Sequence, residues 1–96
     1  MEEVTRRVAE RIGRRIRWRR REQELSRETI AWRAEIHRTQ MTLIEHGERL
    51  PRVDTLIKIA AAIGATPCEL LDGLVWEPGD GRPGRLAVIR PGGADG

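Results

Sequence analysis

The sequence predicts an all-α fold of five helices with a short C-terminal β-strand or hairpin. Three observations support this prediction: apolar residues recur at helical spacing, helix start and stop signals separate them, and Gly and Pro concentrate near the C-terminus. Seven of the ten glycines lie from Gly73 onward, and 96 residues leave room for one domain. We therefore expect a helical domain over residues 1–73, a strand or hairpin extension over 74–90 and a disordered tail over 91–96.

The first three helices are predicted from apolar stripes and from the residues that bound them. The first helix ends near Glu22, and the second follows over residues 27–34 with Ser26 as its N-cap. The third runs over about 38–46, and Gly47 supplies the left-handed residue that ends it. The apolar residues expected on their inward faces are Val4, Val8, Ile12, Ile16, Ile30, Ala31, Ala34, Met41 and Ile44.

Two more helices follow a break at Leu50-Pro51. The fourth spans roughly residues 53–63 and is ended by Gly64. The fifth begins at Thr66-Pro67-Cys68-Glu69, which combines a capping box with proline at the first helical position, and runs through Leu71. The apolar residues of the fourth helix are Val53, Leu56, Ile57, Ile59, Ala60 and Ile63.

Alternatives to this assignment exist at two places. Residues 14–46 contain neither Gly nor Pro, so one long helix or a coiled coil is an alternative, but Glu22 and Thr29 are polar at heptad positions where a two-stranded seam needs apolar residues. Residues 74–76 and 86–89 predict a hairpin. A structureless linker is the alternative there, because the intervening loop is longer than usual.

Positive charge is concentrated in the first helix. The net charge is only +3, yet residues 6–21 contain nine arginines and a single acid, Glu10. From Glu22 onward, nine basic residues stand against twelve acidic ones. This asymmetry indicates either a surface for nucleic acid or another anionic partner, or a solvated helix in an arginine-rich sequence.

Several functional classes are excluded by composition and spacing. No window approaches the ~20 apolar residues of a membrane span, and the N-terminus lacks the apolar core of a signal peptide, so we expect a cytoplasmic protein with no membrane partner. His37 and His46 are nine residues apart and Cys68 is the single cysteine, so we expect no metal site. Ser26 serves as a cap and no Gly-rich phosphate loop is present. We therefore expect neither a cofactor nor enzymatic activity.

A series of motifs runs in register along the chain: Leu25-Ser26-Arg27-Glu28-Thr29-Ile30-Ala31, Ala34, Ile36, Ile44-Glu45-His46-Gly47, Pro51, Asp54-Thr55-Leu56-Ile57-Lys58-Ile59-Ala60, Ile63-Gly64-Ala65 and Glu69-Leu70-Leu71. The whole series resembles the helix-turn-helix domain of the Cro/XRE family, which includes the phage lambda-type repressors. With the first helix added from Ile12, the resemblance covers about sixty residues. It implies a five-helix lambda repressor-like DNA-binding domain that acts as a sequence-specific transcriptional regulator.

Four positions depart from the family pattern. Glu35 stands in the turn that usually carries Gly, and a left-handed non-Gly residue costs roughly 1–2 kcal/mol. His37 replaces the usual Ser or Thr cap of the third helix, so we expect a weaker helix start. Arg19 stands where the family commonly buries a leucine, and Leu43 takes a position that is more often polar. These changes affect base preference more than fold.

The resemblance implies that the helix over 38–46 enters the major groove, with Arg38, Thr39, Thr42 and Leu43 on its outward side. Arg38 would pair with a guanine edge, a contact that contributes about 1–3 kcal/mol of discrimination. The threonines would bond base or phosphate, and Leu43 would pack on a thymine methyl group. The alternative for each is an ordinary exposed helix residue. The phosphate contacts expected from the resemblance are Arg17, Arg27, Arg49 and Arg52.

Double-stranded DNA is the partner that the resemblance implies, together with an ion pair between Arg20 and Glu45 that ties the third helix to the first. We also expect a homodimer held largely by the C-terminal hairpin. An isolated hairpin is marginal in water, and Trp18 and Trp32 fall off the inward faces of their helices. In a monomer, the chain's own hairpin could instead cover this surface. Two other functions stay open: an antitoxin or protein-binding module whose tail grips a partner protein, and a nonspecific basic DNA-binding protein.

Overall fold

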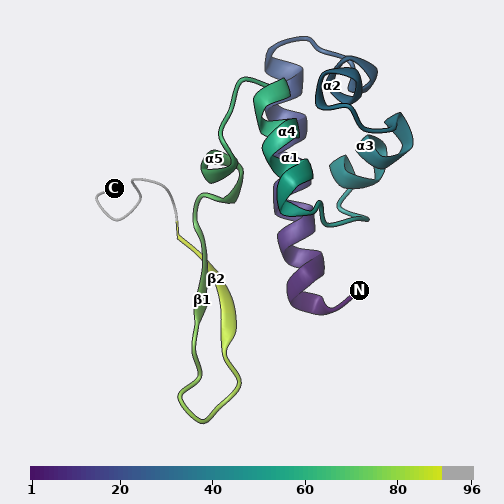
Figure 1. The fold of residues 1–96 in the computed structure, drawn as a ribbon. Coiled ribbons are helices and arrows are strands. Elements are labelled where there is room, and N and C mark those ends of the chain that lie inside the picture. The colour runs from purple at the N-terminus through teal and green to yellow at the C-terminus, as the bar shows by residue number, and fades with distance from the viewer. Residues whose placement is uncertain (90–96) are drawn as a thin grey trace.

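The computed structural model describes residues 1–89, which form five α-helices and one two-stranded antiparallel sheet. Figure 1 shows α1 as a long central helix, with α2 and α3 on one side of it and α5 and the hairpin on the other. The elements are α1 (Glu3–Glu22), α2 (Arg27–Ala34), α3 (Arg38–Glu45), α4 (Val53–Ala62), α5 (Pro67–Leu71), β1 (Leu74–Glu77) and β2 (Arg85–Val88). The predicted fold class is confirmed; the tail predicted to be disordered over 91–96 lies outside the described residues.

Four turns separate the five helices, and each of them contains a left-handed residue. Glu24 and Glu35 both adopt positive φ, at 54° and 57°, so residues 14–46 do not form one continuous helix. Glu35 occupies the turn between α2 and α3, where the sequence predicts a left-handed residue other than glycine. Gly47 and Gly64 also have positive φ and follow the ends of α3 and α4, as predicted.

Side chains cap the starts of α2, α3 and α5, and the cap of α3 is one that the sequence did not predict. Ser26 accepts a hydrogen bond from the backbone N–H of Thr29, and Thr66 with Glu69 forms a complete capping box at α5. The sequence predicts a weaker start for α3, yet His37 does cap this helix: its Nδ1 accepts from the backbone N–H of Thr39 at 3.0 Å. An imidazole nitrogen with its lone pair free performs here the role of a Ser or Thr oxygen.

The core is aliphatic and lies where α1, α2, α3 and α4 meet. Six isoleucines and one methionine dominate it, and a buried side chain of this size contributes about 1.5–3 kcal/mol to folding. Not every apolar residue points inward: Val53 and Ile57, on the outer face of α4, are exposed. The large side chains that are fully buried are Ile12, Ile16, Ile30, Met41, Ile44, Ile59, Ile63, Leu70 and Glu45.

Arginine side chains from α1 satisfy the carbonyl groups at the C-terminal ends of α4 and α5. Arg15 donates to the carbonyl of Glu69 at 2.7 Å, and Arg19 donates to that of Gly64 at 2.9 Å. The last carbonyls of a helix lack partners within it and carry partial negative charge, so a guanidinium is well suited to them. Arg19, placed where the family commonly has leucine, therefore ties α1 to the end of α4.

The C-terminal segment forms the predicted hairpin, with Leu74 opposite Val88 and Trp76 opposite Leu86. Its loop contains a tight turn, in which Asp80 and Gly81 both have positive φ and the N–H of Arg82 donates to the carbonyl of Gly79. This is the Asp-Gly arrangement that suits the twist of a hairpin. Figure 1 shows the hairpin extending away from the helices, and the two strands contact each other far more than any helix.

The tryptophans of α1 and α2 remain on the surface. Trp18 is 67% exposed and Trp32 is 80% exposed, as the helical spacing predicts. The hairpin does not bury them. None of the helices in residues 1–89 is both long and apolar enough to cross a bilayer.

Candidate nucleic-acid interface

One face of α3 is turned away from the core and carries most of the predicted base-reading residues. Met41, Ile44 and Glu45 are buried, whereas Thr39 is exposed and Thr42 and Leu43 are half-buried. The helical spacing of Thr39, Thr42 and Leu43 extends to His46, the exposed residue that ends α3. Sequence reasoning missed His46, although the same three- and four-residue spacing identifies it.

The inward face of α3 is fixed by a buried carboxylate. Glu45 accepts from Nε of Arg20 at 2.5 Å and from Nε of Arg27 at 3.0 Å, and its side chain has no exposed surface. The predicted pair between Arg20 and Glu45 is therefore confirmed, and it joins α1 to α3. The bond from Arg27 was not predicted, and it adds α2 to the same anchor.

The charge state of Glu45 follows from these contacts. Burial alone would raise the pKa of the Glu45 carboxyl. Hydrogen bonds and positive charges from Arg20 and Arg27 outweigh that effect and hold the pKa below its ordinary value. Glu45 is therefore an anion that bonds simultaneously to side chains from α1 and α2, and α3 cannot rotate without breaking these bonds.

Arg27, Arg38 and Thr42 meet around a hollow of about 410 Å³ between the starts of α2 and α3. Arg38 pairs with Glu28 at 3.3 Å, but both side chains are more than 70% exposed. An exposed pair contributes about 0–1 kcal/mol, so Arg38 can exchange Glu28 for a stronger partner. Thr42 donates its hydroxyl to the carbonyl of Arg38 at 3.1 Å and keeps its acceptor lone pairs free.

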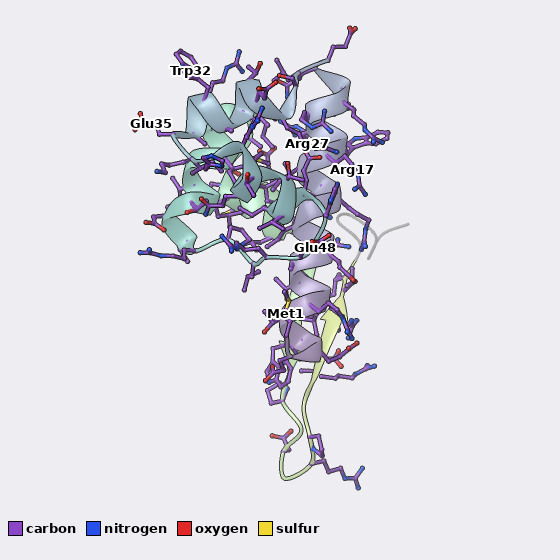
Figure 2. The ribbon with its side chains drawn as sticks, turned by 90° about the vertical axis from the view of Figure 1, so that its right-hand side faces the viewer. Met1, Arg17, Arg27, Trp32, Glu35 and Glu48 are labelled. Atoms are coloured by element: carbon purple, nitrogen blue, oxygen red, sulfur yellow. The ribbon has the colours of Figure 1, made fainter. Side chains whose placement is uncertain are left out.

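The other predicted phosphate contacts do not line this hollow. Arg52 is exposed at the start of α4, 3.6 Å from Asp54, and Arg49 is exposed in the preceding loop. Figure 2 shows Arg17 on the flank of α1 and Arg27 at the start of α2, with Trp32 and Glu35 at the opposite end of α2. Arg17 lines a second groove, between α1 and α5. The structure thus brings Arg27, Arg38 and Thr42 together at the hollow. The other predicted arginines lie on separate elements.

Within residues 1–89, no three His, Cys, Asp or Glu side chains form a group that could hold a metal ion. Cys68 is a free, exposed thiol on α5. The chemistry of the site is therefore that of hydrogen-bond donors and cations around a protruding helix. Such groups are complementary to phosphate oxygens and to base edges.

A short helix, a tight turn and a second helix with one anchored and one exposed face define a helix-turn-helix protein. The model of the family described as "Helix-turn-helix domain" matches residues 11–72. The chain belongs to this family, and the resemblance found in its sequence is confirmed.

Two control proteins are similar to the chain. Control protein C.BamHI of Bacillus amyloliquefaciens is 40% identical over 48 residues, which represent 50% of this chain and 59% of the relative. The chain thus spans less than two thirds of that relative. The restriction-modification controller protein C.AhdI of Aeromonas hydrophila is 31% identical, with a TM-score of 0.62 over 65% of this chain and 94% of that one.

Two further solved structures resemble the chain to different degrees. The competence regulator ComR of Streptococcus vestibularis is 38% identical, with a TM-score of 0.62, over 67% of this chain and 22% of that chain. The clp gene regulator ClgR of Corynebacterium glutamicum is 19% identical, with a TM-score of 0.64 over 67% of this chain and 68% of that one. At that identity, the likeness to ClgR concerns the fold alone.

Proposed function

We propose that this protein is a sequence-specific DNA-binding transcriptional regulator that inserts α3 into the major groove. The observation that carries the proposal is the division of α3 into two faces, one anchored through Glu45 and one offering Thr39, Thr42 and Leu43. Membership in the helix-turn-helix family and similarity to two control proteins support it. The protein is a binding protein in this proposal, not an enzyme, and access to chromosomal DNA requires a cytoplasmic location.

In the proposed complex, Arg38 leaves Glu28 and pairs with a base edge near the start of α3. Thr39, Thr42, Leu43 and His46 follow along the groove. Positive side chains on several elements hold the flanking phosphates, which positions the domain without reading sequence. The phosphate-binding residues in this proposal are Arg17, Arg27, Arg49 and Arg52.

Substituting two arginines separates base reading from phosphate binding. We expect Arg38→Ala to cost about 1–3 kcal/mol on the preferred site and to relax one base position. Arg52→Ala should weaken binding to all sequences and reduce the salt slope by about one. Selection of bound sequences from random DNA supplies the preferred site, and salt titrations measure both variants. Equal losses on the preferred site and on random DNA for Arg38→Ala would contradict base reading by this side chain.

Selection also tests whether the protein reads sequence at all. A sequence-specific regulator enriches a defined site, and a dimer enriches one with dyad symmetry. A purely nonspecific basic protein enriches none. The salt dependence of binding to unselected DNA gives the nonspecific term separately.

We further propose that residues 1–73 are the DNA-binding domain and that residues 74–90 are an extension that holds two copies together. The apolar side chains of Leu74, Trp76, Leu86 and Val88 share one face of the hairpin, because registered partners point the same way. Trp76 and Val88 are exposed and Leu74 and Leu86 are half-buried, so much of this face is free. A second copy would bury it and place two α3 helices about one helical turn of DNA apart.

Truncation after Gly73 should convert the dimer to a monomer, because it removes the whole hairpin. Light scattering at tens of micromolar measures the mass of the full-length and truncated chains. The double variant Trp76→Ser/Val88→Ser is the matched comparison for the truncation. It keeps the whole chain and changes only two exposed side chains of the hairpin. A truncated chain that still dimerises, or a full-length chain that is monomeric, would contradict the role given to the hairpin.

The same exposed face supports a second candidate function. An antitoxin or other protein-binding module on this fold would use the hairpin to grip a different protein, with or without DNA. Co-purification of a second chain that is lost in the Trp76→Ser/Val88→Ser variant would favour this candidate. A homodimer of unchanged mass in crude and purified samples would favour the regulator.

A further inference from the structure

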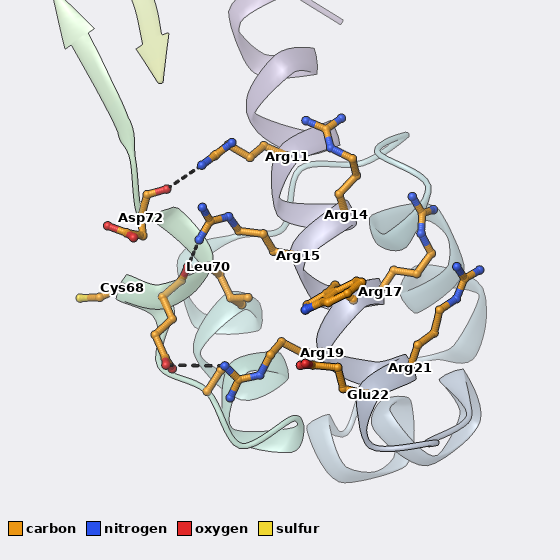
Figure 3. A pocket seen from close by; sticks show the side chains of 13 residues that line it. Arg11, Arg14, Arg15, Arg17, Arg19, Arg21, Glu22, Cys68, Leu70 and Asp72 are labelled. Atoms are coloured by element: carbon orange, nitrogen blue, oxygen red, sulfur yellow. Dashed lines mark hydrogen bonds and ion pairs between the residues drawn. The ribbon is translucent and has the colours of Figure 1, made fainter. Parts of the chain in front are cut away.

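A groove of about 920 Å³ runs between the C-terminal half of α1 and α5, and none of the residues around the α2–α3 hollow lines it. Figure 3 shows arginines of α1 along one wall and Cys68, Leu70 and Asp72 on the other. Six arginines and Trp18 line the α1 side. Three carboxylates also line the groove, those of Glu22 on α1 and of Glu69 and Asp72 on the other side, so the groove carries an excess of positive charge.

Half of these arginines already have partners within the protein. Arg11, Arg15 and Arg19 donate to backbone carbonyls at the ends of α4 and α5, and Glu69 pairs with Arg19 at 3.6 Å. Within residues 1–89 the other three make no hydrogen bond and no ion pair through their side chains. These three, spaced along α1, are Arg14, Arg17 and Arg21.

The arginines also crowd one another. Nε of Arg11 is buried without a hydrogen-bond partner among the described residues. Burial, followed by the like charges of Arg15 and Arg14, lowers the pKa of Arg11. An anion placed in the groove would relieve this repulsion, which no carboxylate of the described chain fully does.

An aromatic side chain stands in the middle of this positive surface. Trp18 is 67% exposed, and helical geometry puts Arg14, Arg15 and Arg21 next to it at three- and four-residue spacing. Binding of a nucleic-acid duplex through its phosphates requires only the positively charged side chains. An exposed indole among cations is complementary to a ligand that alternates apolar and acidic groups.

One wall of the groove, formed by α5, lies on the other side of α1 from the helix proposed to read DNA. Gly13 lets α1 approach the backbone of Glu45 on the flank that faces α3, whereas Arg11 and Arg15 bond to α5 on the opposite flank. Figure 1 shows α3 and α5 on opposite sides of α1. The α5 wall of the groove therefore lies across α1 from α3.

We propose that this groove binds an acidic, amphipathic segment of a partner protein, with carboxylates on Arg14 and Arg21 and an apolar side chain on Trp18. The proposal does not depend on DNA binding by α3. It gives the arginine-rich half of α1 a function that the proposed DNA contacts leave unassigned, apart from Arg17.

A synthetic peptide tests the proposal with the full-length protein. The probe is a fluorescein-labelled 16-residue peptide that has Glu and Leu at helical spacing and no Trp, and fluorescence anisotropy measures its binding. We expect the double variant Arg14→Glu/Arg21→Glu to weaken peptide binding about tenfold or more. Neither side chain has a partner within residues 1–89, and circular dichroism at rising temperature verifies that the variant folds.

The matched control reverses two arginines outside the groove. Arg49→Glu/Arg52→Glu changes the net charge by the same amount as the groove variant. Because both residues lie outside the groove, it should leave peptide binding within about twofold while it weakens binding to a 20-base-pair duplex. Fluorescence of a Trp32→Phe/Trp76→Phe protein reports on Trp18 alone and should shift to shorter wavelength when the peptide binds.

Three outcomes would overturn the proposal. The first is that the peptide fails to bind the unaltered protein. The second is that both double variants weaken peptide binding equally, which would show that binding depends only on net charge. The third outcome is that Arg14→Glu/Arg21→Glu weakens duplex binding as much as Arg49→Glu/Arg52→Glu does, which would make the groove part of a nucleic-acid surface. Duplex binding by the unaltered protein is measured separately, so failure of the groove proposal leaves the DNA-binding proposal intact.

Discussion

Replacing Glu45 by alanine is expected to lower the free energy of unfolding by about 3–5 kcal/mol, because Arg20 loses its buried carboxylate partner. The Arg20 side chain is only 12% exposed, so water cannot fully replace the lost carboxylate. A domain of this size is stable by about 5–15 kcal/mol, and the substitution removes a large share of that. Urea denaturation followed by circular dichroism measures the loss.

Controls distinguish the buried charge from the shape of the side chain. Glu45→Gln keeps the volume and removes the charge, and we expect most of the loss to remain. Arg38→Ala breaks only the exposed pair with Glu28 and should change stability by no more than about 1 kcal/mol. A denaturation midpoint that Glu45→Ala leaves unchanged would show that this pair does not hold α3 in place.

The same carboxylate makes stability depend on pH in a defined direction. The folded pKa of Glu45 lies below its ordinary value of 4.5, so the unfolded chain binds the proton more readily. The contribution of Glu45 is complete above the unfolded pKa and is lost as pH falls through the folded pKa. The difference in unfolding free energy between the unaltered protein and Glu45→Gln should therefore shrink below about pH 4.5. A difference that is constant from neutral pH into this acidic range would be inconsistent with the lowered pKa.

Gly13→Ala is expected to destabilise the protein by about 2 kcal/mol, even though alanine favours a helix. A Cβ at this position would lie 2.5 Å from the carbonyl oxygen of Glu45 and 2.7 Å from that of Ile44. Both atoms belong to backbone, so α3 must move as a unit. We therefore expect weaker binding to the selected DNA site as well as lower stability.

Substitution at the next residue isolates the helix-propensity term. Arg14 is exposed on α1, so the difference between Arg14→Ala and Arg14→Gly gives the propensity gain without a packing change. Thermal unfolding of all variants gives the comparison. If Gly13→Ala proves more stable than the unaltered protein by that same increment, then α1 and α3 do not meet as closely as the structure has them.

Local signals in the sequence predict most of the fold. Caps, glycines and apolar spacing locate the helices to within one residue at their ends. The pair between Arg20 and Glu45 also follows, because the motif series places both residues in a known register. The bond from Arg27 to the same carboxylate could not be predicted, since α2 must be docked before its first side chain can be placed.

The contacts made by arginine show where sequence reasoning stops. Arg11, Arg15 and Arg19 reach carbonyls that lie 61, 54 and 45 residues away along the chain. Backbone acceptors carry no residue-specific signal, so neither composition nor spacing identifies them. The α1–α5 groove depends on these contacts and therefore becomes visible only in the folded chain.

The sparse contact between the hairpin and the helices divides the molecule into two levels of local stability. β1 and β2 can separate and expose their amides to hydrogen exchange without disturbing the isoleucine core, at a free-energy cost below that of global unfolding. A partner of the hairpin then binds only those chains in which the two strands are paired. Its apparent affinity is reduced in proportion to the fraction of chains in that state. The Asp80-Gly81 turn and the close approach of Gly84 to the Trp76 ring favour the formed state. In the proposed dimer, residues far from both α3 and the groove would therefore set how tightly two copies associate.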